Sequence, residues 1–571
     1  MRRIGAGVLG VALAVSGCTA VADESATTTS ITLGASEAVV QNDSILRYGL
    51  SSSPSDSWVH YRTGCDTSCS IVLGAITDTL FATAASGETV GLLVELARSN
   101  NDNTVHTWQL RQGIVFSDGT EFDGAAAKLN IDACRHSALT GPGLAGIDDV
   151  RADGHTLTIT TLAPWGNLAA HFAETPCGHM FSGAWLRSLP DLPMRTEGAP
   201  FFDSAIAEIS PVGDQTQPVG LGAFVMTSFA PGNGNSTLLD RNESYWRGAA
   251  GITGETLPLA ERAEFVVIDD GATRQAGLEA GQFDLIHSRD PLGQQAIVES
   301  GPSVTSDAFA GVVHVAMNAA ADEANPLALV SCRRAVDRSM DRSAFSTPFG
   351  RSSSTGPFLD LGTAENRPAV ESEKFSADVA SQWGNRCIES FGAGFTLRLL
   401  APAGDDRAAL VASMVERSIG ALAGGGGVTV ELVTVEPQAL ALAALLGDYD
   451  LLLWEGFAGN HPDLHFTWWY SEAAAPVGSI STNVGRIEDP ALDRALVDLR
   501  RADNVNDSDR ATDEVERAFE AGAWTSWLST ISWTIGFSPL LEADIERTTP
   551  EGVELEPIVN GVHTLHHLGE G

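Results

Sequence analysis

The sequence predicts an α/β protein of two or more domains that is exported from the cytoplasm. Runs of alternating apolar and polar residues, typical of strands, are interspersed along the chain with segments of helical apolar spacing. The 571 residues exceed what one hydrophobic core usually organises, which indicates at least two domains. The first residues have the layout of a secretory signal.

The N-terminal segment predicts the compartment. Two arginines precede an uncharged apolar run, residues 4–15, that is too short to span a bilayer. The run leads into Val-Ser-Gly-Cys, which resembles the bacterial lipobox, and this implies cleavage before Cys18 and lipid attachment to its thiol. An ordinary signal peptide with an incidental cysteine is the alternative. We expect a signal peptide over residues 1–17 and a flexible tether, rich in Ser, Thr, Ala and Glu, over residues 18–42.

Local patterns predict the individual elements. The dipeptide Asp118-Gly119 between two apolar runs predicts a hairpin turn. A run of glycines at 424–427 is interpreted as a loop, because no Lys and Ser/Thr follow in the register of a phosphate-binding loop. The expected strands begin at Ile45 and cover His106–Leu110, Thr156–Thr160 and Val428–Val435, and the expected helices cover Ile71–Phe81, Gly124–Cys134 and Ala408–Leu422.

The charge of the chain excludes one class of partner. Its formal net charge is −39, and removal of the two N-terminal arginines would make it more negative. A field of that sign repels phosphate backbones, so we expect no nucleic-acid binding. It is compatible with cationic ligands, or with an acidic surface that serves solubility. No later run is long and apolar enough for a transmembrane helix.

Six segments along the chain carry a resemblance to one protein family. The first is "TWQLRQGIVFSDGTEFDGAAAKLNIDAC", and the others, in order, are "PVGLGAFVMTSFAPGN" with "LLDRNESYW", "GLEAGQFDLI", "MNAAADEANPLALVSCRRAVDRSMDRSAF", "GDYDLLLWEGFAGNHPDL" and "EDPALDRAL". They resemble, in the same order, the peptide/nickel-type solute-binding proteins of ABC importers, called family 5, whose pattern F-x-L-R-x-G-V-x-F-H-D-G is similar to the first segment. Each match is weak alone, but their collinearity over nearly the whole mature chain is specific.

The resemblance implies a two-lobed periplasmic-binding-protein (Venus-flytrap) fold with an extra subdomain in lobe one. Two strands would cross between the lobes, near Val312–Asn318 and near Ile531–Phe537. We therefore expect lobe one over 43–312 plus 533–571, the inserted subdomain over about 61–211, and lobe two over 313–532.

Six cysteines remain once Cys18 is assigned to the lipid, and an even number outside the cytoplasm suggests disulfides. Six cysteines allow fifteen pairings. A metal site at the first two is the rival interpretation, but no Cys/His pair with zinc spacing accompanies them. The preferred pairs each stay within one expected structural unit, and they are Cys65–Cys69, Cys134–Cys177 and Cys332–Cys387.

The segment from Trp454 to Asp463 contains the expected ligand-binding residues. The resemblance implies that, in peptide-binding relatives, this motif supplies an aromatic wall, backbone groups and an Asp that pairs with the peptide's α-ammonium. Here that position is Asn460, and a neutral amide compensates a buried charge only partly. Either Glu455 replaces the missing acid or the ligand lacks the ammonium; packing within the lobe is the alternative role of the segment. The expected ligand residues here are Trp454, Gly456, Phe457, Ala458, Asn460 and Asp463.

Three further residues are candidate ligand contacts. Asn318 resembles a family Asn beside the cleft, where it would bond the ligand or the hinge backbone. Trp58 and Tyr61 lie where the first loop of relatives meets ligand; exposed aromatics would suit a promiscuous pocket, although a Trp is more often part of a core. The His-x-Asp-x-His run at 461–465 and the histidines of 563–567 are considered as metal ligands, but a third ligand is missing for the first, so we expect no metal and no cofactor.

The expected function is a binding protein without enzymatic turnover, since neither a G-x-S-x-G elbow nor an H-E-x-x-H helix is present. It would be a monomer, held outside the cytoplasmic membrane by lipid alone, that captures a peptide-like solute and delivers it to an ABC permease with its cytoplasmic ATPase. The alternative is a surface sensor or binding lipoprotein of the same fold for a non-peptide ligand, either an oligosaccharide or a metal chelate.

Overall fold

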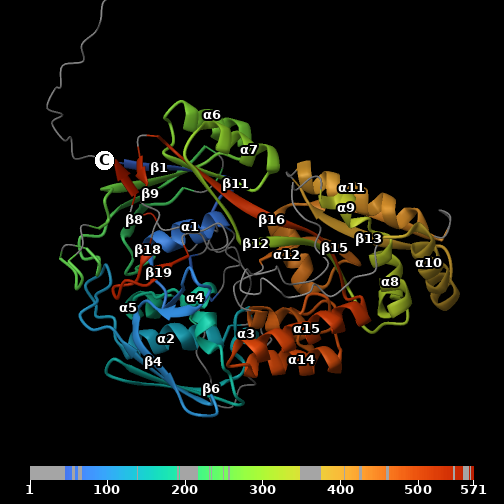
Figure 1. Cartoon of the computed structure of the whole chain (residues 1–571), viewed down its shortest axis with the longest axis horizontal. Coiled ribbons are helices and arrows are strands. Elements are labelled where there is room, and N and C mark those ends of the chain that lie inside the picture. The colour runs from blue at the N-terminus through green and yellow to red at the C-terminus, as the bar shows by residue number, and fades with distance from the viewer. Residues whose placement is uncertain are drawn as a thin grey trace, which may run out of the picture. The chain divides into compact units, whose positions relative to one another are not determined.

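The computed structural model forms one compact unit over Asp43–Gly571 (Figure 1). The expected signal peptide, tether and lipid-modified Cys18 lie outside the described residues, as do Cys65, Ala458, Asn460, His461, the glycines at 424–426 and the histidines at 563, 566 and 567. The structure describes residues 45–54, 58–61, 67–137, 139–189, 192, 217–230, 232, 234–248, 250–254, 257–346, 375–403, 406–422, 427–457, 462–539, 541–543, 547–556, 565 and 568–570.

A ten-stranded sheet connects both lobes of the two-lobed α/β fold, with strand order β14-β13-β15-β12-β16-β11-β1-β10-β9-β8. In lobe one β1 runs parallel to β10 and β11, and in lobe two β13 runs parallel to β14 and β15. The strands are β1 (Ile45–Leu50), β8 (Phe224–Ser228), β9 (Ser236–Arg241), β10 (Arg262–Val267), β11 (Leu285–Ser288), β12 (Ser303–Met317), β13 (Phe395–Pro402), β14 (Val428–Val435), β15 (Leu451–Phe457) and β16 (Thr525–Phe537).

The two central strands, β12 and β16, pass from one lobe to the other. Their antiparallel register shifts between Ser306 and Gly311. Only the part of β12 from Gly311 onward pairs with β15 of lobe two, whereas the end of β16 pairs with β11 of lobe one. We infer that β12 changes lobe between Ser306 and Gly311, a few residues before the expected 312–318, and that β16 does so near Ile531, within the expected range.

The lobe-two sheet is covered by helices on both faces. Leu399, Leu451 and Leu453 pack with the cluster that contains α11, whereas the alternate residues Leu400 and Leu452 pack with the cluster of α12. Opposite burial of successive residues is the expected signature of a parallel sheet between two helical layers. The helices of this lobe are α8 (Val330–Arg338), α9 (Arg342–Ser346), α10 (Ala377–Phe391), α11 (Asp406–Gly420), α12 (Pro437–Leu446), α13 (Phe466–Trp469), α14 (Pro490–Arg501) and α15 (Val505–Gly522).

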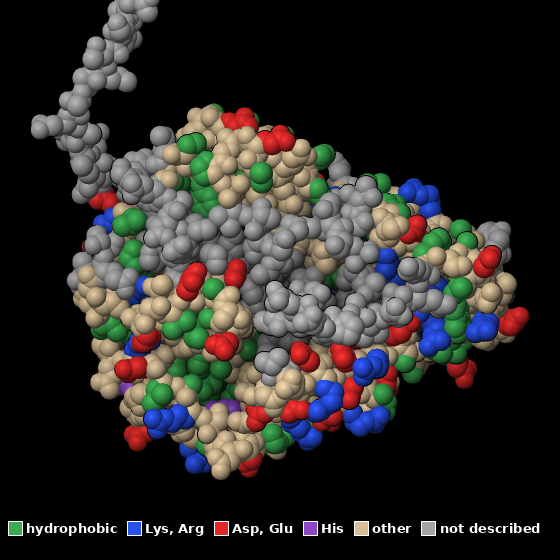
Figure 2. All heavy atoms as spheres, viewed as in Figure 1, with side chains coloured by type: hydrophobic (Ala, Val, Ile, Leu, Met, Phe, Trp, Pro, Cys, Tyr) green, Lys and Arg blue, Asp and Glu red, His purple; other side chains and the backbone are tan. Residues whose placement is uncertain are grey.

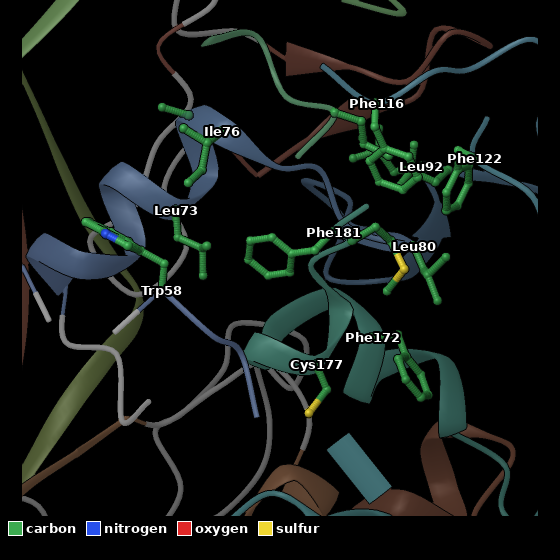
Figure 3. Packing of buried hydrophobic residues seen from close by; sticks show 14 of the residues in the cluster. Trp58, Leu73, Ile76, Leu80, Leu92, Phe116, Phe122, Phe172, Cys177 and Phe181 are labelled. Carbon is green, nitrogen blue, oxygen red and sulfur yellow. The ribbon is translucent and has the colours of Figure 1, made fainter. Parts of the chain in front are cut away.

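Lobe one has its own core, part of which is drawn in Figure 3. Two helices beside β11 begin at aspartates, because the side chains of Asp270 and Asp290 accept hydrogen bonds from free N–H groups of the first turns. The four-stranded sheet β4-β5-β7-β6 packs with a helix in the expected subdomain. These elements are α1 (Thr67–Ile76), β4 (Val94–Ser99), β5 (Val105–Leu110), α2 (Gly124–Arg135), β6 (Ile147–Asp153), β7 (Thr156–Thr161), α6 (Gly271–Glu279) and α7 (Pro291–Ser300).

Short elements lie between the longer ones. They include β2 (Phe81–Thr83), β3 (Thr89–Gly91), α3 (Gly141–Leu144), α4 (His171–Glu174), α5 (Gly183–Ser188), the 3-10 turn η6 (Pro462–His465), and the C-terminal strands β17 (Leu541–Ala543), β18 (Arg547–Thr548), β19 (Glu554–Leu555) and β20 (Leu568–Glu570).

Most local predictions are confirmed. The strand over Val428–Val435 has the expected bounds, and Gly119 lies in the turn after Phe116 with a φ of 80°. The helix expected to reach Phe81 ends instead at Ile76, because Gly220 and Gly222 pack against the backbone there and Phe81 begins β2. Apolar residues continue through the boundary, so the helical pattern conceals it.

Two of the expected disulfides, Cys134–Cys177 and Cys332–Cys387, are present. Cys69 is also disulfide-bonded, and its expected partner lies outside the described residues. Acidic and basic side chains are interspersed over α14 and α15 on the face shown in Figure 2. Exposed ion pairs of α15 include Arg510–Asp507. Among the helices described, none combines the length and apolar character needed to cross a membrane.

Candidate functional site

The carboxyl ends of both sets of parallel strands point toward the opposite lobe. Strand β11 runs in the same direction as β12, because both are antiparallel to β16. Strands β1 and β10 run in this direction too, because β1 is parallel to β10 and to β11. Strand β15 is antiparallel to β12, so β13, β14 and β15 end on the side of lobe one. Ligands of open α/β sheets bind outside the carboxyl ends of the strands. The topology therefore puts the candidate site between the lobes, at these ends.

A group of three charged side chains joins the lobes at these strand ends, and we call it the hinge cluster. Glu455 of β15 accepts hydrogen bonds from Arg289, which follows β11, and from Nη2 of Arg407 at 3.0 Å. Nη1 of Arg407 also donates to the backbone oxygen of Arg289 at 3.1 Å. The guanidinium of Arg289 lies 5.8 Å from the ring centroid of Trp533. Two cations thus meet one carboxylate at the edge of the candidate site.

The hinge cluster changes the expectation for Glu455. This acid is already engaged by two guanidinium groups, which oppose the approach of a ligand ammonium and favour an anionic group. The side chains of Glu455 and Arg289 are 24% and 41% exposed, so solvent and solutes reach part of the cluster. Sequence reasoning missed both arginines, because they are adjacent to Glu455 only in the folded chain.

A second polar group lies under the carboxyl ends of β1 and β11. His287 shares hydrogen bonds with Ser51 Oγ, at 2.8 Å from Nε2, and with the Tyr48 hydroxyl, at 3.2 Å from Nδ1. Its ring is 5.3 Å from that of Trp533, in an edge-to-face arrangement. Burial raises the pKa of the Tyr48 phenol, so the hydroxyl keeps its proton. This network holds the end of β1 against β11.

The aromatic residues expected near the ligand are buried. Trp58 is 2% exposed and meets Phe229 edge-on at 5.1 Å, and Tyr61 is 1% exposed. Figure 3 shows Trp58 among the core residues around α1. Of the roles weighed for these residues, their burial favours the core, because both rings contribute to the lobe-one core. A ligand contact by either residue stays a prediction. The indole nitrogen of Trp58 is buried without a hydrogen-bond partner among the described residues.

Asn318 serves the backbone in this structure. Its Nδ2 donates to the carbonyl oxygens of Gly447 and Tyr449, at 2.9 and 3.0 Å, and its Oδ1 accepts from the amide of Ala320. These bonds tie the end of β12 to the turn that precedes β15. Of the two roles weighed for Asn318, the geometry favours the bond to hinge backbone.

Of the predicted ligand segment, the structure describes Trp454–Phe457 at the end of β15 and Pro462–Asp463 in η6. Trp454 is half-buried and packs against the cluster of Leu440 and Tyr449. Gly456 pairs with Val312, and a Cβ there would lie 3.2 Å from Cε1 of His314. Phe457 pairs with Gly311 through its backbone. A ligand contact by these residues stays a prediction.

Asp463 contacts protein groups rather than an open site. Its Oδ1 accepts from Arg500 Nε at 2.8 Å, and its Oδ2 accepts from Trp165 Nε1 at 2.7 Å and from His171 Nε2 at 3.1 Å. The Asp463 side chain is fully buried. This differs from the expected ligand role, because the carboxylate is enclosed by side chains from two distant parts of the chain. Nothing in the sequence paired these residues.

Burial is the main cause of the pKa shifts of the residues around Asp463. It lowers the pKa of His171 despite the adjacent carboxylate, and it lowers the pKa of Arg500 as well. The neighbouring His465 stacks on Trp469 with ring centroids 4.9 Å apart. Within the described ranges, no group of three His, Cys, Asp or Glu side chains could hold a metal ion.

A sheet that runs through two α/β lobes, whose parallel strands end toward each other, defines a two-lobed binding protein. The chain belongs to the bacterial extracellular solute-binding proteins of family 5, since the model of that family ("family 5 Middle") matches residues 88–476. It is a solute-binding protein of an extracytoplasmic class.

Known proteins resemble this chain in sequence or in fold. A probable peptide ABC transporter periplasmic-binding protein, y4tO of Sinorhizobium fredii, is 25% identical over 245 residues, and the match covers 41% of each chain, well under two thirds of that relative. The Helicobacter pylori protein DppA in complex with the peptide STSA has a TM-score of 0.72 at 16% identity, covering 92% of this chain and 98% of that one.

Two further solved structures hold ligands of other classes. AgaA of A. tumefaciens R10 in complex with agropinic acid has a TM-score of 0.70 at 18% identity, covering 87% of this chain and 94% of that one. NikA of Staphylococcus aureus in complex with Ni(L-His)2 has a TM-score of 0.68 at 17% identity, covering 92% and 100%. At these identities the likeness shows the fold alone.

Proposed function

We propose that this chain captures a peptide-like solute between its two lobes, outside the cytoplasmic membrane, and delivers it to an ABC import permease. The observation that carries the proposal is the hinge cluster at the carboxyl ends of the parallel strands. A guanidinium pair beside one carboxylate provides a site for a carboxylate group, which every peptide carries at its C-terminus. Closure of the two lobes around the solute would bury most of its surface.

A second candidate is a non-peptide solute without an α-ammonium, such as an opine-like acid, a metal chelate or an oligosaccharide. Two observations favour it. Asn460 stands where relatives have the ammonium-binding Asp, and Glu455 is held by Arg289 and Arg407 rather than free to replace that Asp. Neighbours of this fold bind agropinic acid and a nickel–histidine complex.

A thermal-shift screen of the chain beginning after Cys18 tests both candidates. A specific ligand raises the melting temperature by mass action. At a hundredfold excess over Kd it adds about 2.7 kcal/mol to the free energy of unfolding. The panel comprises free peptides, N-acetylated peptides, opine-like acids, oligosaccharides and nickel–histidine chelates. Stabilisation by free or N-acetylated peptides supports the peptide-like solute, whereas stabilisation only by opine-like acids, oligosaccharides or nickel–histidine chelates supports the second candidate and overturns the first.

The variant Arg407→Met sharpens the screen. It should abolish the shift from ligands with a carboxylate and keep the shift from neutral oligosaccharides, if any bind. Unchanged binding of every acid by this variant would contradict the role given to the hinge cluster. Arg417→Met, on the same helix α11 but in its last turn, is the matched control and should behave like the unmodified chain.

We also infer that Cys18 carries the lipid anchor, that the chain works as a monomer, and that it performs no catalysis. The lipobox-like sequence before Cys18 supports the anchor. Labelling of cells with a fatty-acid analogue should mark the unmodified chain and not Cys18→Ser. Label that persists in the variant would contradict the anchor.

A further inference from the structure

The buried group around Asp463 links two regions that are far apart in the sequence, and we call it the rim cluster. Asp463 lies in η6 and Arg500 in the last turn of α14, both in the expected lobe two. Trp165 and His171 belong to the expected subdomain of lobe one. The hydrogen bonds of Asp463 Oδ2 to Trp165 and His171 therefore join the two lobes, whereas its bond to Arg500 stays within lobe two.

Arg500, the cation of the rim cluster, is also enclosed by residues of both lobes. The guanidinium of Arg500 lies 3.6 Å from the ring centroid of Phe466, in its own lobe, and 3.9 Å from that of Trp165, in the other. Its Nη2 donates to the backbone oxygen of Gly143 at 3.4 Å, a residue of lobe one. Asp463 and Arg500 thus form an ion pair within lobe two, and the Trp165 indole of lobe one covers it.

Backbone contacts fix the register of this docking. The amide of Gly166 donates to the backbone oxygen of Arg500 at 3.0 Å, and Asn167 Nδ2 donates to that of Ala502 at 2.8 Å. A Cβ on Gly166 would lie 2.2 Å from the Ala502 oxygen, so only glycine allows this approach. Three acceptor atoms of lobe two, the backbone oxygens of Arg500 and Ala502 and Oδ2 of Asp463, thus receive four hydrogen bonds from lobe one in a single arrangement.

We propose that the rim cluster is the contact that determines closure of the two lobes, and that Trp165, His171 and Asp463 set solute affinity without touching the solute. This inference rests on the proposed capture of a solute between the lobes. When the lobes separate, Asp463 exchanges two N–H donors for water, and Arg500 loses its indole cover. Their interaction therefore favours the closed state specifically, and apparent affinity scales with the population of the state that binds.

The effect is expected to be uniform across ligands. Because the rim cluster contacts no solute, weakening it should raise every Kd by the same factor, through a faster dissociation rate. A substitution in the solute site would instead affect some ligands more than others. Uniformity thus separates a closure residue from a ligand contact.

The first test uses no ligand, so it remains informative if the proposed function fails. Hydrogen exchange is followed at the Gly166 amide, whose acceptor is the Arg500 oxygen of the other lobe. The variant Trp165→Phe keeps a ring over Arg500 but removes the indole donor. Loss of a hydrogen bond to a charged group should increase opening, and exchange at Gly166, about tenfold or more. Amides of β5 and β7, inside the subdomain, should not change.

Trp246→Phe is the matched control. Trp246 Nε1 donates to Asp78 Oδ2 at 2.6 Å, so the same indole–carboxylate bond is removed, but both residues lie in lobe one. It should leave exchange at Gly166 unchanged. If Trp165→Phe does not fold, Asn167→Ala, which removes only the half-buried bond to Ala502, should show the same effect at smaller size.

Two results would overturn the inference. One is unchanged exchange at Gly166 in Trp165→Phe and Asn167→Ala, and the other is an equal increase in Trp246→Phe. For each ligand of the panel that binds the unmodified chain, Trp165→Phe should also raise Kd by one common factor. A factor that differs between ligands would reassign Trp165 to the solute site.

Discussion

The hinge cluster and the rim cluster both join the lobes through a carboxylate and an arginine, yet their surroundings differ. In the hinge cluster Arg289 is 41% exposed, Glu455 24% and Arg407 10%. In the rim cluster Asp463 is fully buried and Arg500 is 9% exposed. A partly exposed group can exchange a protein partner for a solute at small cost, whereas a buried pair depends on its own partners. The comparison indicates that the first cluster suits recognition and the second suits docking.

The largest difference should appear when one arginine of the rim cluster is removed. Arg500→Met leaves Asp463 buried without its cation, which should lower the free energy of unfolding by about 3–5 kcal/mol. Urea unfolding followed by circular dichroism measures it. Arg501→Met, whose exposed side chain pairs with Asp498 at 3.6 Å, is the control and should stay within about 0.5 kcal/mol. Equal effects of the two variants would show that burial does not distinguish them.

Acidification should destabilise the rim cluster, because it contains the buried His171. Burial lowers the folded-state pKa of His171 below the ordinary 6.5, so the unfolded chain binds more protons just below that pH. Stability contributed by neutral His171 is therefore present above pH 6.5 and is lost as the pH falls toward the lowered pKa, by at most about 1.4 kcal/mol per pH unit. Asp463, Arg500 and Trp165 are the groups that face this ring.

The variant His171→Gln measures that contribution. Unfolding free energies between pH 7 and pH 5 should fall less steeply in the variant, with the remaining slope due to other buried histidines, among them His60, whose pKa burial lowers to about 4. A slope unaltered by His171→Gln would mean that this ring does not titrate on unfolding.

Neutralising the hinge-cluster acid should alter recognition more than stability. Glu455→Gln releases two guanidinium groups toward the solute, so acidic ligands should bind severalfold more tightly, by about 1 kcal/mol. Calorimetry of the acids that bind the unmodified chain measures the change, and neutral ligands are the control. Weaker binding of acids would mean that Glu455 orients the arginines rather than competing for them.

The smallest effect is expected for the most exposed arginine. Arg289→Met should lower the unfolding free energy by less than about 1 kcal/mol, since an ion pair that water reaches gains little. Chemical denaturation at low and high salt measures it, and the difference should shrink as salt screens the pair. A loss comparable to that of Arg500→Met would remove the distinction between the clusters.

Local sequence patterns predicted much of the fold. The alternation in Val428–Val435, the Asp118-Gly119 turn and the helix from Gly124 depend on neighbours a few residues away, so they could be read directly. The end of α1 could not, because glycines more than a hundred residues later press on the backbone at Ile76. Two disulfides were also predicted, since each closes within one structural unit.

The candidate site was predicted only in part. Glu455 and Asp463 were singled out from one segment, but their partners were not. Arg289 is 166 positions from Glu455, and Trp165 is 298 positions from Asp463. No periodicity or spacing reports contacts of that range. Trp58 and Tyr61 were candidate ligand contacts with a core position as the alternative, because the sequence does not distinguish an aromatic ring in a pocket from one in a core.

The sequence by itself determined the class of protein, the two-lobed fold and most strands and helices, because these follow from local patterns and from the order of the segments. Only the tertiary structure decided which charges meet. Whether a carboxylate such as Glu455 or Asp463 is open to a solute or enclosed by the protein depends on side chains brought from the other lobe. Burial by those side chains sets the free energy of the charged form of each carboxylate, and this burial exists only in the folded chain.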